Sequence, residues 1–302
     1  MSQTDLTPHF KDTKEASYQL QKQSPQAITD LLLDFAAALR MGAQTIIDAN
    51  AEDLARMDPE NPLYDRLLLD KERLSAIADD VQKVAHLPNP IGQELEKRTL
   101  PNEAVLSRIY VPLGVVSAIY EARPNVTIDI FSLCMRTQNA CILRGGQDAQ
   151  ETNIAIMHII HQVLREHHLP TALAYLMPAE RSYMPQLLNA YGLIDVCIPR
   201  GSQNLIDYVR ENASIPVIET GRGVVHIYMD DDVDTKMAQN VSNNAKSRRV
   251  SVCNALDTLV IHEKHLAQLD NILAPLIAQN TVIHADDKAH AVLATAGIEN
   301  LH

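Results

Sequence analysis

Apolar residues recur at helical spacing in the first part of the chain, and prolines interrupt the pattern. One stretch places its apolar residues on a single helical face: Ile28, Leu31, Leu32, Phe35, Ala38 and Leu39. A further helix-compatible stretch covers 53–57, and prolines lie at positions 59, 62, 88 and 90. The pattern predicts a helical region over residues 14–90, which the turn-forming segment 89–92 ends.

Beyond residue 110 the pattern changes to short apolar runs rich in β-forming residues. The predicted strands cover 111–120, 140–143, 173–177, 194–198, 216–219, 224–229 and 256–262. Helices are predicted after Pro124 and over 152–166, 183–190, 202–211, 233–246 and 264–278. Strands that alternate with helices of this length indicate βαβ units. We therefore expect an α/β fold, with a doubly wound, Rossmann-like parallel sheet after the N-terminal helices and the start of a second α/β domain.

Composition and charge exclude several classes of protein. The 302 residues suffice for two domains, and a hydrophobic content of 46% suffices for buried cores. With 26 basic against 38 acidic residues the formal net charge is −12, so we expect no nucleic-acid surface. No apolar run approaches a membrane span, and the first residues lack the apolar core of a secretory signal. The four cysteines lack paired spacing, which is typical of a reducing compartment, so we expect a soluble, cytoplasmic protein. The cysteines and histidines show no metal-ligand spacing, so we expect no metal site.

Cys253 differs from the other cysteines because small and polar residues surround it. Three cations precede it closely: Lys246, Arg248 and Arg249. The thiolate is the nucleophilic form of cysteine and nearby positive charge stabilises it, so Cys253 is a candidate nucleophile. The others have apolar neighbours and are typical of buried thiols: Cys134, Cys141 and Cys197. The alternative for Cys253 is a buried structural thiol. The three cations before it either form a phosphate site or complement the dipole at the end of a helix.

Two glycine-containing turns follow predicted strands. The sequence has no dinucleotide fingerprint, because its one Gly-x-Gly, at 221–223, has His226 where the third glycine would stand. It has no Walker loop either. Arg144, Gly145 and Gly146 come directly after one strand, and Arg200, Gly201 and Ser202 after another. Ligands of open parallel sheets bind at the carboxyl ends of the strands, and helix amides there can face a phosphate. The two turns predict a cofactor groove; tight turns that need glycine for backbone freedom are the alternative.

Asn125 and Glu219 are the remaining candidates. Asn125 lies between a strand end and a helix start, where its amide can donate to a developing oxyanion. The alternative is an ordinary Asn at a helix N-terminus or in a turn. Glu219 ends an otherwise apolar strand and is either a general base or a structural acceptor for loop amides.

In this order along the chain, the motifs resemble the gamma-glutamyl phosphate reductase (glutamate-5-semialdehyde dehydrogenase) family, a branch of the aldehyde dehydrogenase superfamily. The likeness covers essentially the whole sequence. The helical start contributes ANAEDL (49–54) and DRLLL (65–69). The later segments are VPLGV (111–115), IYEARPNVT (119–127), ACILRGG (140–146), IPRG (198–201), PVIETG (216–221) and SVCNA (251–255).

The resemblance implies an NADPH-dependent reduction of L-glutamyl 5-phosphate to L-glutamate 5-semialdehyde and phosphate in proline biosynthesis. It implies that Cys253 attacks the acyl phosphate to form a thioester, which hydride then reduces. It places Asn125 and the Cys253 amide at the oxyanion, and both glycine-containing turns at the cofactor. Glu219 falls where hydrolysing relatives activate water, and its role here stays open.

The resemblance also implies two domains along the chain. We expect helices and an NADP-binding Rossmann-like domain over 1–230, and the beginning of a catalytic domain over 231–302. Arg123 and Tyr120 are candidates for the glutamyl group, and the cations before Cys253 become candidates for receiving phosphate. The sequence departs from the family pattern at Val250, where proline is usual, and at 222–225.

Family members continue beyond the equivalent of residue 302, with the rest of the catalytic domain and an arm used for homo-oligomerisation. Two alternatives to the reductase remain, and the difference in length is the reason for the first of them. One is a catalytically incompetent fragment that binds nucleotide or a partner chain. The other is a different aldehyde or acyl-CoA reductase of the superfamily.

Overall fold

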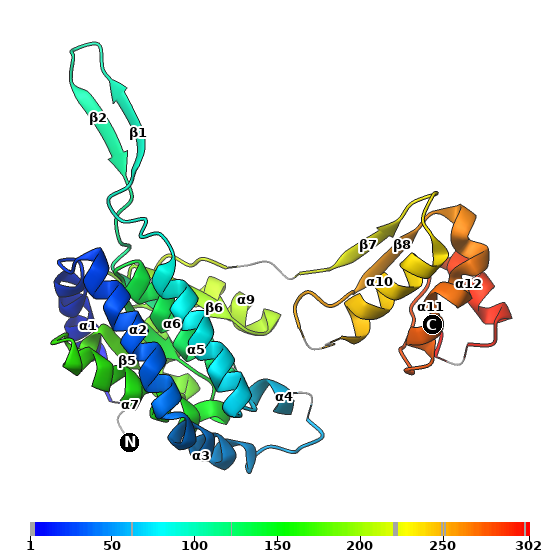
Figure 1. Ribbon diagram of the computed structural model, residues 1–302, viewed down its shortest axis with the longest axis horizontal. Helices are drawn as coiled ribbons and strands as arrows, with labels where there is room; N and C mark the ends of the chain where they lie inside the picture. Colours follow the sequence, from blue (N-terminus) through cyan, green and yellow to red (C-terminus); the bar gives the residue numbers. More distant parts are fainter. Residues whose placement is uncertain are drawn as a thin grey trace. The chain divides into compact units, whose positions relative to one another are not determined.

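The computed structural model describes residues 4–61, 63–121, 123–219, 223–248, 250, 252–298 and 300–302. The chain forms two compact units, Met1–Thr220 and Gly221–His302 (Figure 1). None of the helices in the described ranges is both long and apolar enough to cross a membrane.

The predicted helical N-terminal region is confirmed. Its helices are α1 (Thr7–Leu20), α2 (Pro25–Met41), α3 (Ala43–Leu54), α4 (Tyr64–Leu67) and α5 (Lys71–His86). Side chains that accept a backbone N–H of the first turn define two of the starts, because they satisfy donors that the helix leaves unpaired. Ser24 accepts from Ala27 at 3.1 Å and Asp70 from Arg73 at 2.8 Å.

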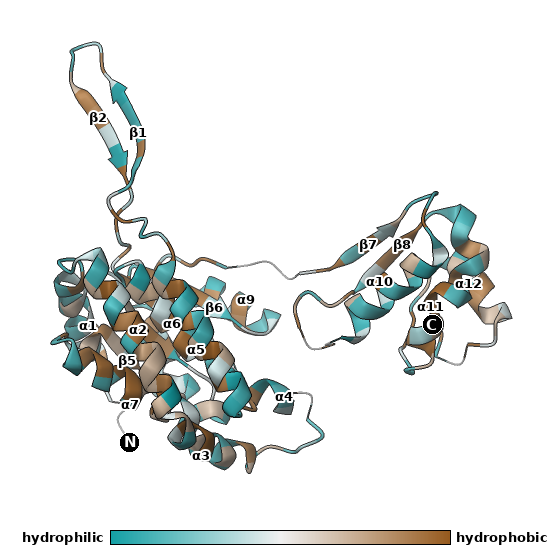
Figure 2. Cartoon of the chain, in the orientation of Figure 1, coloured by the Kyte–Doolittle hydropathy of each residue, from teal (hydrophilic) through white to brown (hydrophobic). Residues whose placement is uncertain are grey.

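A two-stranded antiparallel hairpin follows, which the apolar pattern did not predict. Strands β1 (Glu94–Thr99) and β2 (Val105–Ile109) pair with each other, and every residue of both is exposed. β1 is largely hydrophilic and β2 mixes both kinds of residue (Figure 2). Because neither face of the hairpin is buried, its sequence lacks the alternation that identifies a strand. The strand predicted from residue 111 begins only at Val115.

A four-stranded parallel sheet forms the centre of the first unit, as predicted. It consists of β3 (Val115–Tyr120), β4 (Ala140–Arg144), β5 (Ala174–Leu176) and β6 (Val196–Arg200), in the order β5-β4-β3-β6. The α-helices between these strands are α6 (Asn125–Arg136), α7 (Gln150–Glu166) and α8 (Met184–Leu188), and α9 (Gln203–Asn212) follows β6. Of the strand predicted at 216–219, Val217 makes an isolated bridge to Cys197 of β6.

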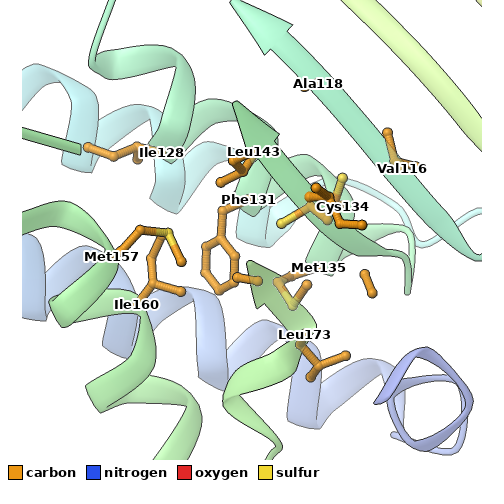
Figure 3. Packing of buried hydrophobic residues seen from close by; sticks show 14 of the residues in the cluster. Val116, Ala118, Ile128, Phe131, Cys134, Met135, Leu143, Met157, Ile160 and Leu173 are labelled. Carbon is orange, nitrogen blue, oxygen red and sulfur yellow. The ribbon is translucent and has the colours of Figure 1, made fainter. Parts of the chain in front are cut away.

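Helices α6 and α7 pack against this sheet through a continuous apolar core. Phe131 of α6 contacts Phe35 of α2 edge to face, with ring centroids 5.0 Å apart. The core residues around Phe131 include Leu143 of β4 and Met157 and Ile160 of α7 (Figure 3). Burial of these side chains supplies the main driving force for folding of the unit.

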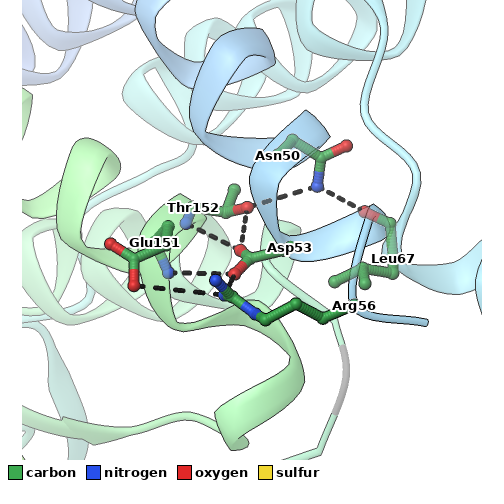
Figure 4. Close-up of polar contacts among 6 residues, drawn as sticks. All are labelled: Asn50, Asp53, Arg56, Leu67, Glu151 and Thr152. Carbon is green, nitrogen blue, oxygen red and sulfur yellow. Dashed lines mark hydrogen bonds and ion pairs between the residues drawn. The ribbon is translucent and has the colours of Figure 1, made fainter.

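The N-terminus of α7 is capped by a side chain from α3. The Asp53 carboxylate, fully buried, accepts from the Thr152 N–H at 2.8 Å, the Thr152 hydroxyl at 2.6 Å and the Glu151 N–H at 3.2 Å (Figure 4). Arg56 pairs with the same carboxylate. Asn50 donates to Thr152 and to the Leu67 carbonyl. The network therefore joins α3 to the helix that follows the Arg144–Gly146 turn.

The second unit is a smaller α/β structure. Its strands β7 (His226–Met229) and β8 (Thr258–Ile261) pair in parallel, and α10 (Thr235–Ser247) connects them. A 3₁₀ helix (Glu263–Gln268), α11 (Leu269–Ile277) and an unpredicted α12 (Asp287–Thr295) follow. The expected domain boundary at 230/231 would assign β7 to the first domain. The division falls between Thr220 and Gly221 because β7 pairs with β8.

Candidate active site

Three of the predicted segments meet at the carboxyl edge of the parallel sheet. The strand register places Ile119 of β3 beside Arg144 of β4 and Tyr120 beside Arg200 of β6. The segments that leave these strand ends carry Asn125 and the two glycine-containing turns. This edge is where open parallel sheets bind ligands.

Asn125 is the first residue of α6, and its side chain does not cap the helix. The half-buried amide Nδ2 donates to the Asp129 carboxylate, one turn later, at 3.1 Å. Burial raises the pKa of Asp129 above its usual value; the hydrogen bond from Asn125 opposes this, Asp80 adds to it and Arg200 opposes it. Asp129 was not predicted as a site residue, although its spacing of four from Asn125 is the spacing of side-chain pairs on a helix.

The Arg144–Gly146 turn is held closely against buried polar groups. A Cβ atom on Gly145 would lie 2.3 Å from Asn153 Nδ2 and 3.3 Å from the Tyr120 ring, so close packing, not an unusual φ, requires glycine here. Arg144 is buried and donates to the Ala179 carbonyl, and within the described ranges its Nε has no hydrogen-bond partner. Burial and the nearby Arg181 lower the pKa of Arg144.

A pocket of about 220 Å³ opens beside this turn. Its lining includes Gly145, Gly146, Asn153, Pro178 and Glu180. The pocket lies at the ends of β4 and β5 and is bounded by the start of α7. Two residues of the turn for which the sequence predicts a cofactor, Gly145 and Gly146, therefore form part of its wall.

Tyr120 takes part in a buried hydrogen-bond chain. Its hydroxyl lies 2.6 Å from the Thr127 hydroxyl, which donates to Asn153 Oδ1 at 2.6 Å. Burial raises the pKa of Tyr120 well above its usual value. The hydroxyl thus links β3, α6 and α7 through hydrogen bonds and does not face solvent. Arg123, the other candidate for the glutamyl group, is half-buried, and its carbonyl accepts from the Val126 N–H at 3.0 Å.

The second turn, Arg200–Ser202, is engaged by a carboxylate of the chain. Glu121 accepts from the Ser202 N–H and from its hydroxyl, both at 2.9 Å. A Cβ on Gly201 would lie 2.8 Å from this carboxyl group. At the start of α9 the Ser202 N–H and hydroxyl thus bind a carboxylate of the chain itself. Arg200 itself is exposed.

Glu219 forms an ion pair on the same unit. Its carboxylate lies 3.4 Å from a guanidinium nitrogen of Arg210 on α9, and its side chain is 31% exposed. Arg210 also pairs with Asp207. The Glu219 carboxylate therefore has a charged partner and access to water, and its setting is not apolar.

Cys253 lies in the second unit, in the turn between α10 and β8, and it is exposed. The other cysteines are buried, as predicted: Cys134, Cys141 and Cys197. Of the preceding cations, Lys246 donates to the Leu256 carbonyl at 2.9 Å. Arg248 is the exposed C-cap residue of α10, where a cation also complements the helix dipole. Arg249 lies outside the described residues.

An acidic run, Asp230–Asp232, follows β7. Within the described part of the chain these exposed side chains are the only group of at least three possible ligands close enough to share a metal ion. Lys264 pairs with Asp231 at 2.6 Å, and the Tyr228 hydroxyl donates to Asp230 at 3.1 Å. We assign no metal to this solvated turn.

Two of the known proteins that are similar to the chain are gamma-glutamyl phosphate reductases. No family model matches the sequence. The gamma-glutamyl phosphate reductase of Legionella pneumophila (strain Corby) is 48% identical over 289 residues, which are 96% of this chain and 69% of that protein. The crystal structure of the gamma-glutamyl phosphate reductase of Thermotoga maritima matches with a TM-score of 0.87 at 29% identity, covering 96% of this chain and 72% of that one.

A more distant solved structure shares the fold alone. The acetylating aldehyde dehydrogenase of Geobacillus thermoglucosidasius matches with a TM-score of 0.67 at 16% identity. The match covers 95% of this chain and 61% of that one.

Proposed function

Because this chain belongs to the gamma-glutamyl phosphate reductase family, we propose that it reduces L-glutamyl 5-phosphate to L-glutamate 5-semialdehyde and phosphate, using NADPH, in proline biosynthesis. The observation that carries the proposal is the 48% identity to such a reductase over 96% of the chain. The exposure of Cys253 supports it, because a nucleophilic thiol must be accessible to substrate.

The proposed reaction uses Cys253 as the nucleophile. Its thiolate attacks the acyl carbon, the bond from that carbon to the phosphate oxygen breaks, and phosphate leaves with the bonding electrons. A thioester on Cys253 results. We assign to Asn125 and to the Cys253 backbone amide the donation of hydrogen bonds to the oxyanion that forms during the attack.

The proposed cofactor site uses the turns at the carboxyl edge of the sheet. Two observations fit a dinucleotide there: the pocket beside Gly145 and Gly146, and the buried Arg144 Nε, which has no partner in the described ranges. Arg200, Gly201 and Ser202 would hold a phosphate only after Glu121 releases Ser202. When bound, NADPH supplies the hydride that converts the thioester to the aldehyde.

The remaining candidates receive the following roles. Arg248 is the exposed cation before Cys253, and we propose that it receives the departing phosphate together with Arg249. Lys246 holds the Leu256 carbonyl, and Arg123 is proposed to contact the substrate. Glu219 is proposed to be structural because of its ion pair with Arg210.

The reverse reaction tests this function. The purified chain is expected to reduce NADP⁺ when given glutamate 5-semialdehyde and phosphate. Cys253→Ala is expected to lower kcat by about 10⁴-fold or more. Cys134→Ala, which removes a buried thiol, serves as the matched control and should leave kcat within about twofold.

Three outcomes would contradict the proposal. Turnover that is insensitive to Cys253→Ala would show that Cys253 is not the nucleophile. A preference for simple aldehydes or coenzyme A over semialdehyde and phosphate would favour another reductase of the superfamily. NADPH binding without turnover would favour a nucleotide-binding chain.

A further inference from the structure

The bond between Asn125 and Asp129 constrains the orientation of the Asn125 amide. A side-chain amide presents two N–H donors on one side and a carbonyl acceptor on the other. An ionised carboxylate only accepts, so Asp129 selects the nitrogen of Asn125, at 3.1 Å. One N–H is used in this bond, and the second is left for another acceptor.

Orientation matters because the two ends of an amide have opposite effects on an oxyanion. An N–H stabilises developing negative charge, whereas the carbonyl oxygen repels it. The terminal torsion of asparagine is broad, so an unrestrained amide exchanges its two ends readily. Among the residues that the structure describes, Asp129 is the only one that hydrogen-bonds the Asn125 side chain.

The rigid setting of both residues makes this restraint effective. They share the first turns of α6, a helix packed against α5 and the sheet. Asp129 is half-buried, and the charged groups that act on it are Asp80 of α5 and Arg200 at the end of β6. The position of the Asp129 carboxylate thus follows from the helix that carries it, α6, which packs against β3 and β4.

We propose that Asp129 is a positioning residue, which holds the Asn125 amide with its second N–H directed to the oxyanion. The inference rests on the function proposed above for Asn125. In the proposed role Asp129 acts through Asn125 and contacts neither substrate nor cofactor. Its loss should therefore lower kcat and leave KM nearly unchanged.

A double-mutant cycle tests the proposal. Asn125→Ala is expected to lower kcat by about 10² to 10³-fold. Asp129→Ala is expected to lower it about tenfold, with KM within about twofold. If Asp129 acts through Asn125, the double variant loses no more than Asn125→Ala alone.

The chain offers a matched control on α2. Gln26 donates to Asp30 at 2.8 Å, an exposed amide–carboxylate pair with the same spacing of four. Asp30→Ala should leave kcat unchanged. Asp129→Asn keeps the size of the side chain while removing its charge, so it separates a folding defect from a positioning defect.

The pH profile provides a readout that a purely structural role would not change. The orienting form of Asp129 is ionised, so kcat falls as the pH drops through its pKa, which lies above that of an ordinary aspartate. A protonated Asp129 can instead donate to Asn125 Oδ1 and favour the flipped amide. This acid limb should be absent in Asp129→Asn.

A second readout does not require turnover. The side-chain amide resonances of Asn125, identified by their loss in Asn125→Ala, should shift with the ionisation of Asp129 in a pH titration. They should not shift in Asp129→Asn.

The following outcomes separate the two proposals. Three outcomes would overturn the positioning role of Asp129. They are equal kcat in Asp129→Ala and Asp30→Ala, additive losses of kcat in the double variant, and Asn125 amide resonances that do not shift with pH. An unchanged kcat in Asn125→Ala would overturn the role of Asn125 itself, and this inference with it.

Discussion

At the residue scale, the four cysteines illustrate how environment sets thiol chemistry. Cys253 is exposed in a turn, whereas the other three lie in the core of the first unit. Burial raises the pKa of Cys197 to about 11. Hydrogen bonding to Cys134, together with burial, raises that of Cys141 well above its usual value. Accessibility therefore favours reaction at Cys253, and the raised pKa of Cys141 and of Cys197 disfavours their thiolates.

Alkylation of the native protein should follow this difference. We expect a maleimide to label Cys253 rapidly and the buried thiols at least about 10²-fold more slowly, because they react only after local unfolding. Mass spectrometry of peptides from native and urea-unfolded protein measures the four rates. Fast labelling of Cys134, Cys141 or Cys197 in the native state would contradict the assignment.

Gly145 is a second position where one residue's environment decides its identity. In Gly145→Ala the new methyl group would overlap Asn153 Nδ2, so the turn or α7 must shift. We expect the Kd for NADPH to rise about tenfold, as measured by fluorescence titration. Gly92→Ala is the control, since its Cβ meets no atom within 4 Å although its φ of +79° is strained. Equal Kd values for NADPH in the two variants would show that the Gly145 turn does not contribute to cofactor binding.

At the element scale, helix starts in this chain are secured in two ways. Asp70 caps α5 from the adjacent position in sequence and is exposed. Asp53 caps α7 from another helix, and its side chain is fully buried. Loss of a buried acceptor leaves its donors without partners, whereas water replaces an exposed one.

Substitution of the two caps should therefore have different costs. Asp53→Ala is expected to reduce the free energy of unfolding by about 3 kcal/mol, and Asp70→Ala by about 1 kcal/mol. Urea denaturation of both variants measures the difference. Equal losses would show that the buried network (Figure 4) contributes no more than a local cap.

At the scale of the whole molecule, the two units bury very different amounts of apolar surface. The first has one large core, which extends from the N-terminal helices through the sheet. The second has two small clusters, one around Leu269, Leu273, Leu276 and Leu293, the other around Met229, Ala238 and Ile272. Local stability depends on such burial, so the units should open with different free energies.

Amide hydrogen exchange measures this difference. Exchange in α10 and α11 is expected to be about tenfold or more faster than in β3 and β4. Peptides from the exposed β1–β2 hairpin provide a reference for weak protection. Equal protection of the two units would contradict the expectation.

The sequence by itself determined the fold class, most of the elements and the burial of three cysteines. These features follow from the local spacing of apolar residues, which is set by the geometry of helices and strands. The ordered motifs likewise identified the family. The same reasoning missed the β1–β2 hairpin, because a strand pair without a buried face has no apolar alternation.

Only the tertiary structure decided which polar groups are engaged. It pairs Glu121 with Ser202, caps α7 with Asp53 and buries the Tyr120 hydroxyl against Thr127. These partners, apart from Tyr120 and Thr127, are far apart in sequence and meet because parallel strands place their carboxyl ends together or because helices pack. Asp129 and Asn125 are only four residues apart. The pKa of Asp129, however, depends on burial and on charges from other elements. Contacts of this kind depend on register and packing across the chain, which no local pattern of residues specifies.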